Sequence, residues 1–166
     1  TSFLNAVMAI EDSQFLYHKG VSWTGIVRAA ARNFIHGGVR EGGSTITQQL
    51  VKNYFLTQER TFRRKFTEIF MALLLETRFG KDEILETYVN EVYLGQAGPF
   101  EIHGLAVAAR FFFNKSAEQL TLPEAALLAG TIRGPGFFSP FTHPEKALKR
   151  REQVLKRMLE LNLIDI

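Results

Sequence analysis

Residues 61–80, TFRRKFTEIFMALLLETRFG, carry the strongest helical pattern in the chain, and this pattern decides the fold class. Apolar side chains recur every three or four residues, a spacing that places them along one side of an α-helix. The uninterrupted apolar run from Ile69 to Leu75 is far shorter than the roughly 20 residues needed to span a bilayer. We therefore predict a helix of a folded domain with a broad apolar face. That face consists of Phe62, Phe66, Ile69, Phe70, Leu73 and Leu74.

The other face of this helix carries two cations and a carboxylate within one turn: Arg64, Lys65 and Glu68. One interpretation is a pair of ordinary helix ion pairs, each worth about 0.2–0.5 kcal/mol. The second interpretation is a functional group of charges able to hold a pyrophosphate or a divalent ion. Taken alone, this turn favours the ion-pair interpretation.

The preceding segment, GGSTITQQLVKN, predicts a second helix with an unusual polar side. Gly42–Gly43 allows a tight loop, and Thr45 with Gln48 has the spacing of a capping box. Within the helix Thr45, Gln48, Gln49 and Lys52 follow one another at helical spacing. Solvated helix faces usually carry Glu and Lys, so this stripe suits a polar ligand such as a sugar, and an ordinary polar surface is the alternative.

Further from the central helix, every other periodic segment is also helical. No segment shows a strand pattern, so we predict an all-α fold for a single domain covering residues 1–166. The remaining predicted elements are a helix capped by Ser22 and ending at Gly37–Gly38, a helix capped by Asp82 and running to Gly95, a loop over 96–100, a helix over about 102–113, a helix opened by the capping box Thr121–Glu124, and a last helix from Pro144 to about Leu161.

Near the N-terminus, two adjacent carboxylates end an apolar run in the stretch EDSQFLYHKG, residues 11–20. Partial desolvation would raise the pKa of Glu11 towards that of a useful general base, with Asp12 and His18 near enough in sequence to orient it. The alternative is a solvated pair of carboxylates at a helix end. The bare motif favours this alternative.

The composition and the absence of several known motifs exclude some classes of catalytic site. The chain has no cysteine, which excludes disulfides and thiolate chemistry, and it lacks the motifs of serine nucleophiles, P-loops and zinc proteases. A net charge of +3 is mild, but Arg60, Arg63, Arg64 and Lys65 are clustered, which favours an anionic partner such as a phosphate, a lipid headgroup or nucleic acid. Carboxylate chemistry remains, and two carboxylates flanking a polar groove are typical of glycosidic-bond chemistry. Clustered cations would stabilise a phosphate leaving group.

Five motifs, the last of them in two parts, together resemble one family. In order they are EDSQFLYHKG (11–20), GGSTITQQLVKN (42–53), RRKFTE (63–68), KDEILETYVNEVYLGQ (81–96), and the later pair GLAVAARFFFNK and LTLPEAALLAG. The chain resembles glycosyltransferase family 51, the peptidoglycan glycosyltransferases of class A penicillin-binding proteins and monofunctional transglycosylases.

The resemblance implies a lysozyme-like fold with a smaller membrane-facing lobe around residues 22–66, and an enzyme that polymerises lipid II with inversion. Glu11 would be the general base for the acceptor hydroxyl. Glu68 would lie near the donor pyrophosphate, directly or through Mg²⁺ or Mn²⁺, with no organic cofactor. Lys52, Arg64 and Lys65 would offset the pyrophosphate charge. The further substrate-site residues implied are Asp12, Phe15, His18, Ser44, Thr45, Gln48, Gln49 and Asn53.

The resemblance also implies partners and a location. The partners would be lipid II, the nascent glycan strand, the membrane surface and cell-wall synthesis proteins, with no nucleic acid. The location would be the extracytoplasmic face of the bacterial inner membrane, with this domain cut from a longer protein whose anchor lies outside the chain. Trp23, Ile26, Ile35 and Tyr54 would rest on the bilayer. Asn114 stands where the family often has glycine, and asparagine tolerates the left-handed turn expected there.

Two other functions compete with this one. A lysozyme-like or lytic enzyme on the same fold would cleave glycan, but it would have no use for clustered cations. A non-catalytic module that binds anionic membrane or nucleic acid would explain the cations but neither Glu11 nor Glu68.

Overall fold

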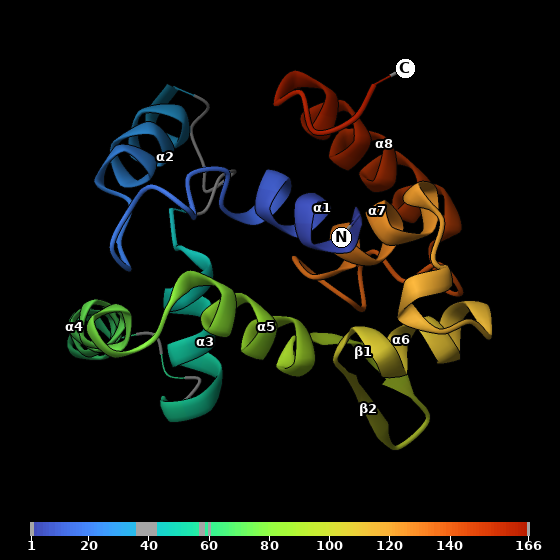
Figure 1. The fold of residues 1–166 in the computed structure, drawn as a ribbon, viewed down its shortest axis with the longest axis horizontal. Coiled ribbons are helices and arrows are strands. Elements are labelled where there is room, and N and C mark those ends of the chain that lie inside the picture. Colours follow the sequence, from blue (N-terminus) through green and yellow to red (C-terminus); the bar gives the residue numbers. More distant parts are fainter. Residues whose placement is uncertain (1, 36–42, 57–58, 60, 166) are drawn as a thin grey trace. The chain divides into compact units, whose positions relative to one another are not determined.

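The computed structural model describes residues 2–35, 43–56, 59 and 61–165, and these residues are mainly helical (Figure 1). The predicted fold class is therefore confirmed. The chain divides into two compact units, unit 1 of Thr1–Ser13 with Glu86–Ile166, and unit 2 of Gln14–Leu85. The elements are α1 (Ser2–Glu11), α2 (Trp23–Ile35), α3 (Ile46–Phe55), α4 (Phe62–Arg78), α5 (Lys81–Glu91), β1 (Tyr93–Ala97), β2 (Phe100–His103), α6 (Leu105–Phe113), the 3₁₀ turn η1 (Ala117–Gln119), α7 (Leu122–Thr131) and α8 (Pro144–Glu160).

The core of unit 1 forms where α7 packs against both α1 and α8 (Figure 1). Small residues let the α7 backbone approach its neighbours closely. A Cβ added at Gly130, for example, would lie 3.0 Å from the Arg150 side chain. The α1–α7–α8 core therefore ties the N-terminal helix to the C-terminal part of the chain. Its fully buried side chains include Ala6, Val7, Ala126, Leu128, Val154 and Met158.

Two strands replace part of a predicted helix in unit 1. Helix α5 ends at Glu91, and residues 93–97 pair antiparallel with 100–103, so the predictions of a helix to Gly95 and a loop over 96–100 were wrong. Helix α6 begins after Gly104 rather than near residue 102. Glycine permits both changes of direction, because Gly98 in the hairpin turn has φ +60° and Gly104 has φ +77°. The all-α fold class holds, but the prediction that no segment forms a strand was wrong.

Most predicted helix ends are confirmed by the hydrogen bonds that cap them. The Thr45–Gln48 and Thr121–Glu124 capping boxes both form, and the Ser22 hydroxyl accepts a hydrogen bond from the N–H of Gly25. The predicted Asp82 cap was wrong. The carbonyl of Gly80 accepts the Ile84 N–H, so α5 begins at Lys81, two residues earlier than a cap at Asp82 would place it. The predicted helix end at Gly37–Gly38 lies outside the described residues.

Unit 2 is built on the packing of α4 against α3, and α4 buries little of its apolar face. The helix itself is confirmed, but its buried residues are Glu68 and Ala72. The predicted apolar face is open: Phe62 is 88% exposed, Phe66 72% and Phe70 67%. The polar side of α4 therefore faces the protein, and an apolar stripe faces outward. Ile46, Leu50 and Val51 of α3 supply the apolar packing instead.

The left-handed turn expected at Asn114 is confirmed, with φ 54° and ψ 37°, and an ion pair follows it. Lys115 Nζ lies 2.7 and 2.9 Å from the two carboxylate oxygens of Glu124, and the Thr121 N–H donates to the same carboxylate at 2.8 Å. The hydrogen bond from Lys115, followed by that from Thr121, lowers the pKa of Glu124 to about 2. These bonds join the end of α6 to the start of α7.

This lowered pKa predicts a specific acid sensitivity. A carboxylate whose folded pKa lies below its ordinary value of 4.5 stabilises the fold above that value, and the stabilisation is lost as the pH falls towards 2. We expect the melting temperature of Glu124→Gln to fall less between pH 7 and pH 3 than that of the wild type. Thermal melts followed by circular dichroism measure this. Glu152→Gln, at an exposed position on α8, is the control. An equal fall in melting temperature in the wild type and in Glu124→Gln would show that the Glu124 carboxylate does not cause the acid sensitivity.

Candidate functional site

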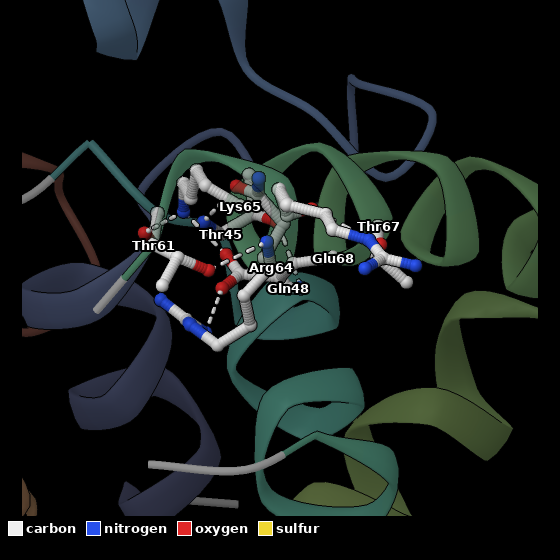
Figure 2. Close-up of polar contacts among 9 residues, drawn as sticks. Thr45, Gln48, Thr61, Arg64, Lys65, Thr67 and Glu68 are labelled. Carbon is white, nitrogen blue, oxygen red and sulfur yellow. Dashed lines mark hydrogen bonds and ion pairs between the residues drawn. The ribbon is translucent and has the colours of Figure 1, made fainter. Parts of the chain in front are cut away.

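At the start of α4 a buried carboxylate is held by two cations (Figure 2). Glu68 is 2% exposed, Arg64 donates to its Oε2 at 2.9 Å, and Lys65 pairs with Oε1. Lys65 Nζ also donates to the Ser44 hydroxyl at 2.8 Å. We call Arg64, Lys65 and Glu68 the α4 cation cluster. Two positive charges face one negative charge, so the cluster has a surplus of positive charge that an anion could neutralise.

The local sequence explains why the cluster forms here. Thr61 caps α4 by accepting the N–H of Arg64 at 3.1 Å, which places Arg64 and Lys65 in the first helical turn. Glu68 follows at i+4 and i+3, the spacings at which helical side chains meet. Free backbone N–H groups and the helix dipole make this end of a helix favourable for anions. The ion pairs expected from sequence are therefore present, with the carboxylate buried and the two cationic side chains partly exposed.

The predicted stripe on α3 is divided between the interior and the surface. Thr45 and Gln48 are each 1% exposed and bond each other in the capping box, at 2.9 and 3.1 Å. The Thr45 hydroxyl also donates to the carbonyl of Gly20 at 2.6 Å. The buried Nε2 of Gln48 has no hydrogen-bond partner among the described residues. Of the other predicted residues, Gln49 and Lys52 are half-buried, and Asn53 is exposed.

A buried network in unit 2 positions Phe15. The Phe15 ring is 1% exposed, its centroid lies 6.1 Å from that of His18, and Lys81 Nζ lies 4.4 Å from it. Lys81 in turn pairs with Glu76 at 2.7 Å, and Glu76 accepts the Thr47 hydroxyl at 2.5 Å. The segment between residues 14 and 20 is thus fixed to α3, α4 and the start of α5.

In unit 1, Glu11 is the last residue of α1 and Asp12 follows it, with Glu11 half-buried and Asp12 buried. Two groups from distant parts of the chain interact with them. Burial, and then the charges of Glu11 and Asp12, raise the pKa of Tyr88 well above its ordinary value. Burial lowers the pKa of Arg150, while the charge of Glu11 acts in the opposite direction. Glu11 therefore lies within the electrostatic reach of a buried phenol and a buried guanidinium.

Tyr88 and Arg150 were missed as site residues by sequence reasoning. Tyr88 lies in sequence among the buried apolar residues of α5, such as Ile84 and Leu85, so nothing local distinguishes it from an ordinary core residue. Arg150 could have been found from the sequence, because this charged residue occupies the apolar side of α8, in line with Ala147, Val154 and Met158. An arginine in a row of buried apolar residues indicates a specific partner, since an unpaired buried charge is costly.

The transglycosylase family model matches residues 1–159. The chain belongs to this family. Its relatives include penicillin-binding protein 1B of Haemophilus influenzae, 45% identical over 161 residues, and penicillin-binding protein 1A of Neisseria gonorrhoeae, 46% identical over 162 residues. Penicillin-binding protein 1A of Aquifex aeolicus is 48% identical over 157 residues. These matches cover 97%, 98% and 95% of this chain and 21%, 20% and 21% of the relatives, so the chain spans about a fifth of their length.

Family membership confirms the resemblance inferred from the five motifs, and the predicted site of this transglycosylase domain divides between its units. Glu11 and Asp12 belong to unit 1. All the other predicted site residues belong to unit 2. Their roles remain predictions.

The ligand set around Glu68 does not suit a divalent cation well. Both carboxylate oxygens are already paired with Arg64 and Lys65. Across the described residues, no three His, Cys, Asp or Glu side chains form a group able to hold a metal ion. A cation at Glu68 would have to displace at least one of the two ion pairs.

Proposed function

We propose that this transglycosylase domain is a peptidoglycan glycosyltransferase that polymerises lipid II into β-1,4-linked glycan strands and releases undecaprenyl pyrophosphate. The observation that carries the proposal is the α4 cation cluster, in which Glu68 holds two cations side by side. A diphosphate leaving group develops negative charge in the transition state, and preorganised cations stabilise that charge. Membership of the transglycosylase family supports the same reaction.

Glu11 is the general base of the proposed reaction. It would accept the proton of the acceptor 4-hydroxyl as that oxygen attacks the anomeric carbon of the donor, which inverts the configuration there. The charge of Glu11 acts on the buried guanidinium of Arg150, so a fixed cation lies within electrostatic reach of the proposed base. Asp12 and Tyr88 border the same carboxylate, so we assign them positioning roles.

The cation cluster binds the leaving pyrophosphate. Glu68 acts as a positioning residue, because its buried carboxylate fixes Arg64 and Lys65 before substrate arrives. The buried Nε2 of Gln48, which no described residue satisfies, is a further donor for a phosphate or sugar oxygen, because a buried donor without a partner is costly. A divalent cation at Glu68 remains a prediction that the assay below tests.

The competing functions are less well supported. A glycan hydrolase acts on a neutral glycosidic bond and leaves the α4 cation cluster without a role. A non-catalytic module would bind anions with the same cluster, but it gives no reason for a carboxylate base beside a buried arginine. Membership of a transglycosylase family favours the enzyme over both alternatives.

We place the domain at the extracytoplasmic face of the inner membrane, where its lipid-linked substrate would lie, with the nascent strand and cell-wall synthesis proteins as partners. No helix among the described residues is long and apolar enough to span a bilayer. Trp23 is 65% exposed, Tyr54 is 47% exposed, and α4 adds its open apolar stripe, all of which suit contact with lipid. Ile26 is half-buried, and the side chain of Ile35 lies outside the described set.

Polymerisation of labelled lipid II in detergent tests the proposal directly. The wild-type domain should give glycan strands that a muramidase digests to disaccharide units. Parallel reactions with a chelator and with added Mg²⁺ or Mn²⁺ test the metal, since an ion at Glu68 makes the rate dependent on it. Cleavage of purified glycan strands without polymerisation would favour the hydrolase instead.

Replacing one cation of the cluster should weaken use of the substrate. We expect Lys65→Gln to lower kcat/KM for lipid II by about 10–100-fold, the loss of one charge-assisted hydrogen bond. Initial rates over a range of lipid II concentrations measure this. Lys149→Gln, at an exposed position on α8, removes the same charge outside the cluster and should leave kcat/KM unchanged. An unchanged kcat/KM in Lys65→Gln would show that the α4 cation cluster takes no part in the reaction.

A further inference from the structure

His103 and Gly104, at the end of the β1–β2 hairpin, contact the C-terminal end of α5. The N–H of Gly104 donates to the carbonyl of Val92 at 3.0 Å, and a Cβ at Gly104 would lie only 2.4 Å from the carbonyl oxygen of Asn90. His103 pairs with Tyr93 in the strand register, and their ring centroids lie 5.3 Å apart. The hairpin therefore starts and ends against the same helix terminus.

Both ring nitrogens of His103 face oxygen atoms that only accept hydrogen bonds. Nδ1 lies 3.0 Å from the backbone carbonyl oxygen of Glu91, and Nε2 lies 3.0 Å from a carboxylate oxygen of Glu101. A neutral imidazole has one N–H and can satisfy only one of these oxygens, whereas the imidazolium form satisfies both. The geometry is thus complete only when the ring carries two protons.

The surrounding charges favour the same protonation state. The hydrogen bond to Glu101 raises the pKa of His103 above its ordinary value, the Glu91 carbonyl adds to the rise, and burial opposes it. The carbonyl end of α5 also carries the negative end of the helix dipole. From β1 the facing group is the Tyr93 phenol. The helices packed on the hairpin, α6 and α7, carry Arg110 and Glu124 as their charged side chains.

We propose that His103 is a pH-sensitive clasp, which in its doubly protonated form locks the β1–β2 hairpin to the C-terminal turn of α5 and loosens when it loses a proton. The clasp would control local opening of the hairpin rather than the chemical step. It rests on this geometry and stands apart from the proposed enzymatic activity.

Linkage gives the direction and size of the effect. A histidine whose folded pKa is raised stabilises the closed hairpin fully below its unfolded pKa, and this contribution is lost as the pH rises through the folded pKa. The opening equilibrium constant should increase by about tenfold for each unit that separates the pKa values of the closed and open states.

Proton NMR of the imidazole resonances tests the first half of the proposal. The resonance absent from His103→Gln identifies the ring in the wild type. We expect the pKa of His103 to lie above the ordinary histidine value in the wild type and to be lower in Glu101→Gln than in the wild type. Glu152→Gln removes one negative charge from an exposed position on α8 and should leave the pKa of His103 unchanged.

Hydrogen exchange of the hairpin amides tests the second half. After correction for intrinsic exchange, the protection of the Gly104 amide should fall in the wild type as the pH passes through the measured pKa. In His103→Arg the side chain keeps its charge and its two donors, so this fall should disappear. A His103 pKa at or below the ordinary value, or the same pH dependence of protection in wild type and His103→Arg, would overturn the proposal.

Discussion

Glu11→Gln should reduce lipid II polymerisation by about 10²–10⁴-fold, the usual contribution of a positioned general base. Glutamine keeps the shape of the side chain but cannot take the proton of the acceptor hydroxyl. Glu11 is half-buried at the end of α1, beside the buried Asp12 and within electrostatic reach of the Tyr88 phenol and the Arg150 guanidinium. The measurement is the initial rate of polymer formation at saturating lipid II.

Two controls distinguish a chemical loss from a folding loss. The circular dichroism spectrum of Glu11→Gln should match that of the wild type, its thermal unfolding should stay cooperative above the assay temperature, and lipid II binding should persist. Glu145→Gln, an exposed change at the start of α8, should retain full activity. Substantial polymerisation by a folded Glu11→Gln protein would assign the base to another residue.

Gly20→Ala should destabilise unit 2 by about 2–5 kcal/mol, a large share of the 5–15 kcal/mol that typically holds a domain together. Gly20 has φ +83°, a conformation that costs alanine about 1–2 kcal/mol. The new Cβ would also lie 2.5 Å from the carbonyl oxygen of Ala72, and overpacking of this kind typically costs about 1–3 kcal/mol. Any shift of residue 20 would strain its hydrogen bond with Thr45.

Urea denaturation followed by tryptophan fluorescence measures this loss, because the single tryptophan, Trp23, belongs to unit 2. Gly98→Ala is the matched control. Its φ of +60° imposes a similar backbone cost, but among the described residues no atom lies within 4 Å of the added Cβ. Followed by circular dichroism, it should lose only about 1–2 kcal/mol. Equal losses at Gly20 and Gly98 would show that contact with α4 adds nothing.

The helices and their caps could be predicted because their signals are local. Thr45 with Gln48, Thr121 with Glu124 and the left-handed turn at Asn114 each depend on residues a few positions apart. The β1–β2 hairpin had no comparable signal. Its strands are only five and four residues long, and the segment before Gly95 also fits the helical period.

The orientation of α4 and the neighbours of Glu11 depend on tertiary contacts that a single sequence does not contain. Periodicity identified the apolar side of α4 correctly, but it cannot tell whether that side faces a core or another apolar phase. Tyr88 and Arg150 reach Glu11 from α5 and α8, far away in the chain, so spacing within a motif could not connect them.

The capping box at the start of α3 changes how substitutions there should be interpreted. Thr45 and Gln48 are predicted substrate-site residues, yet both are buried and each bonds the backbone of the other. A Thr45→Ala protein that has lost activity would therefore not demonstrate contact with lipid II, since the same change uncaps the helix that carries Lys52. Only a variant that keeps the cap and alters the ligand-facing atoms can separate recognition from scaffold integrity.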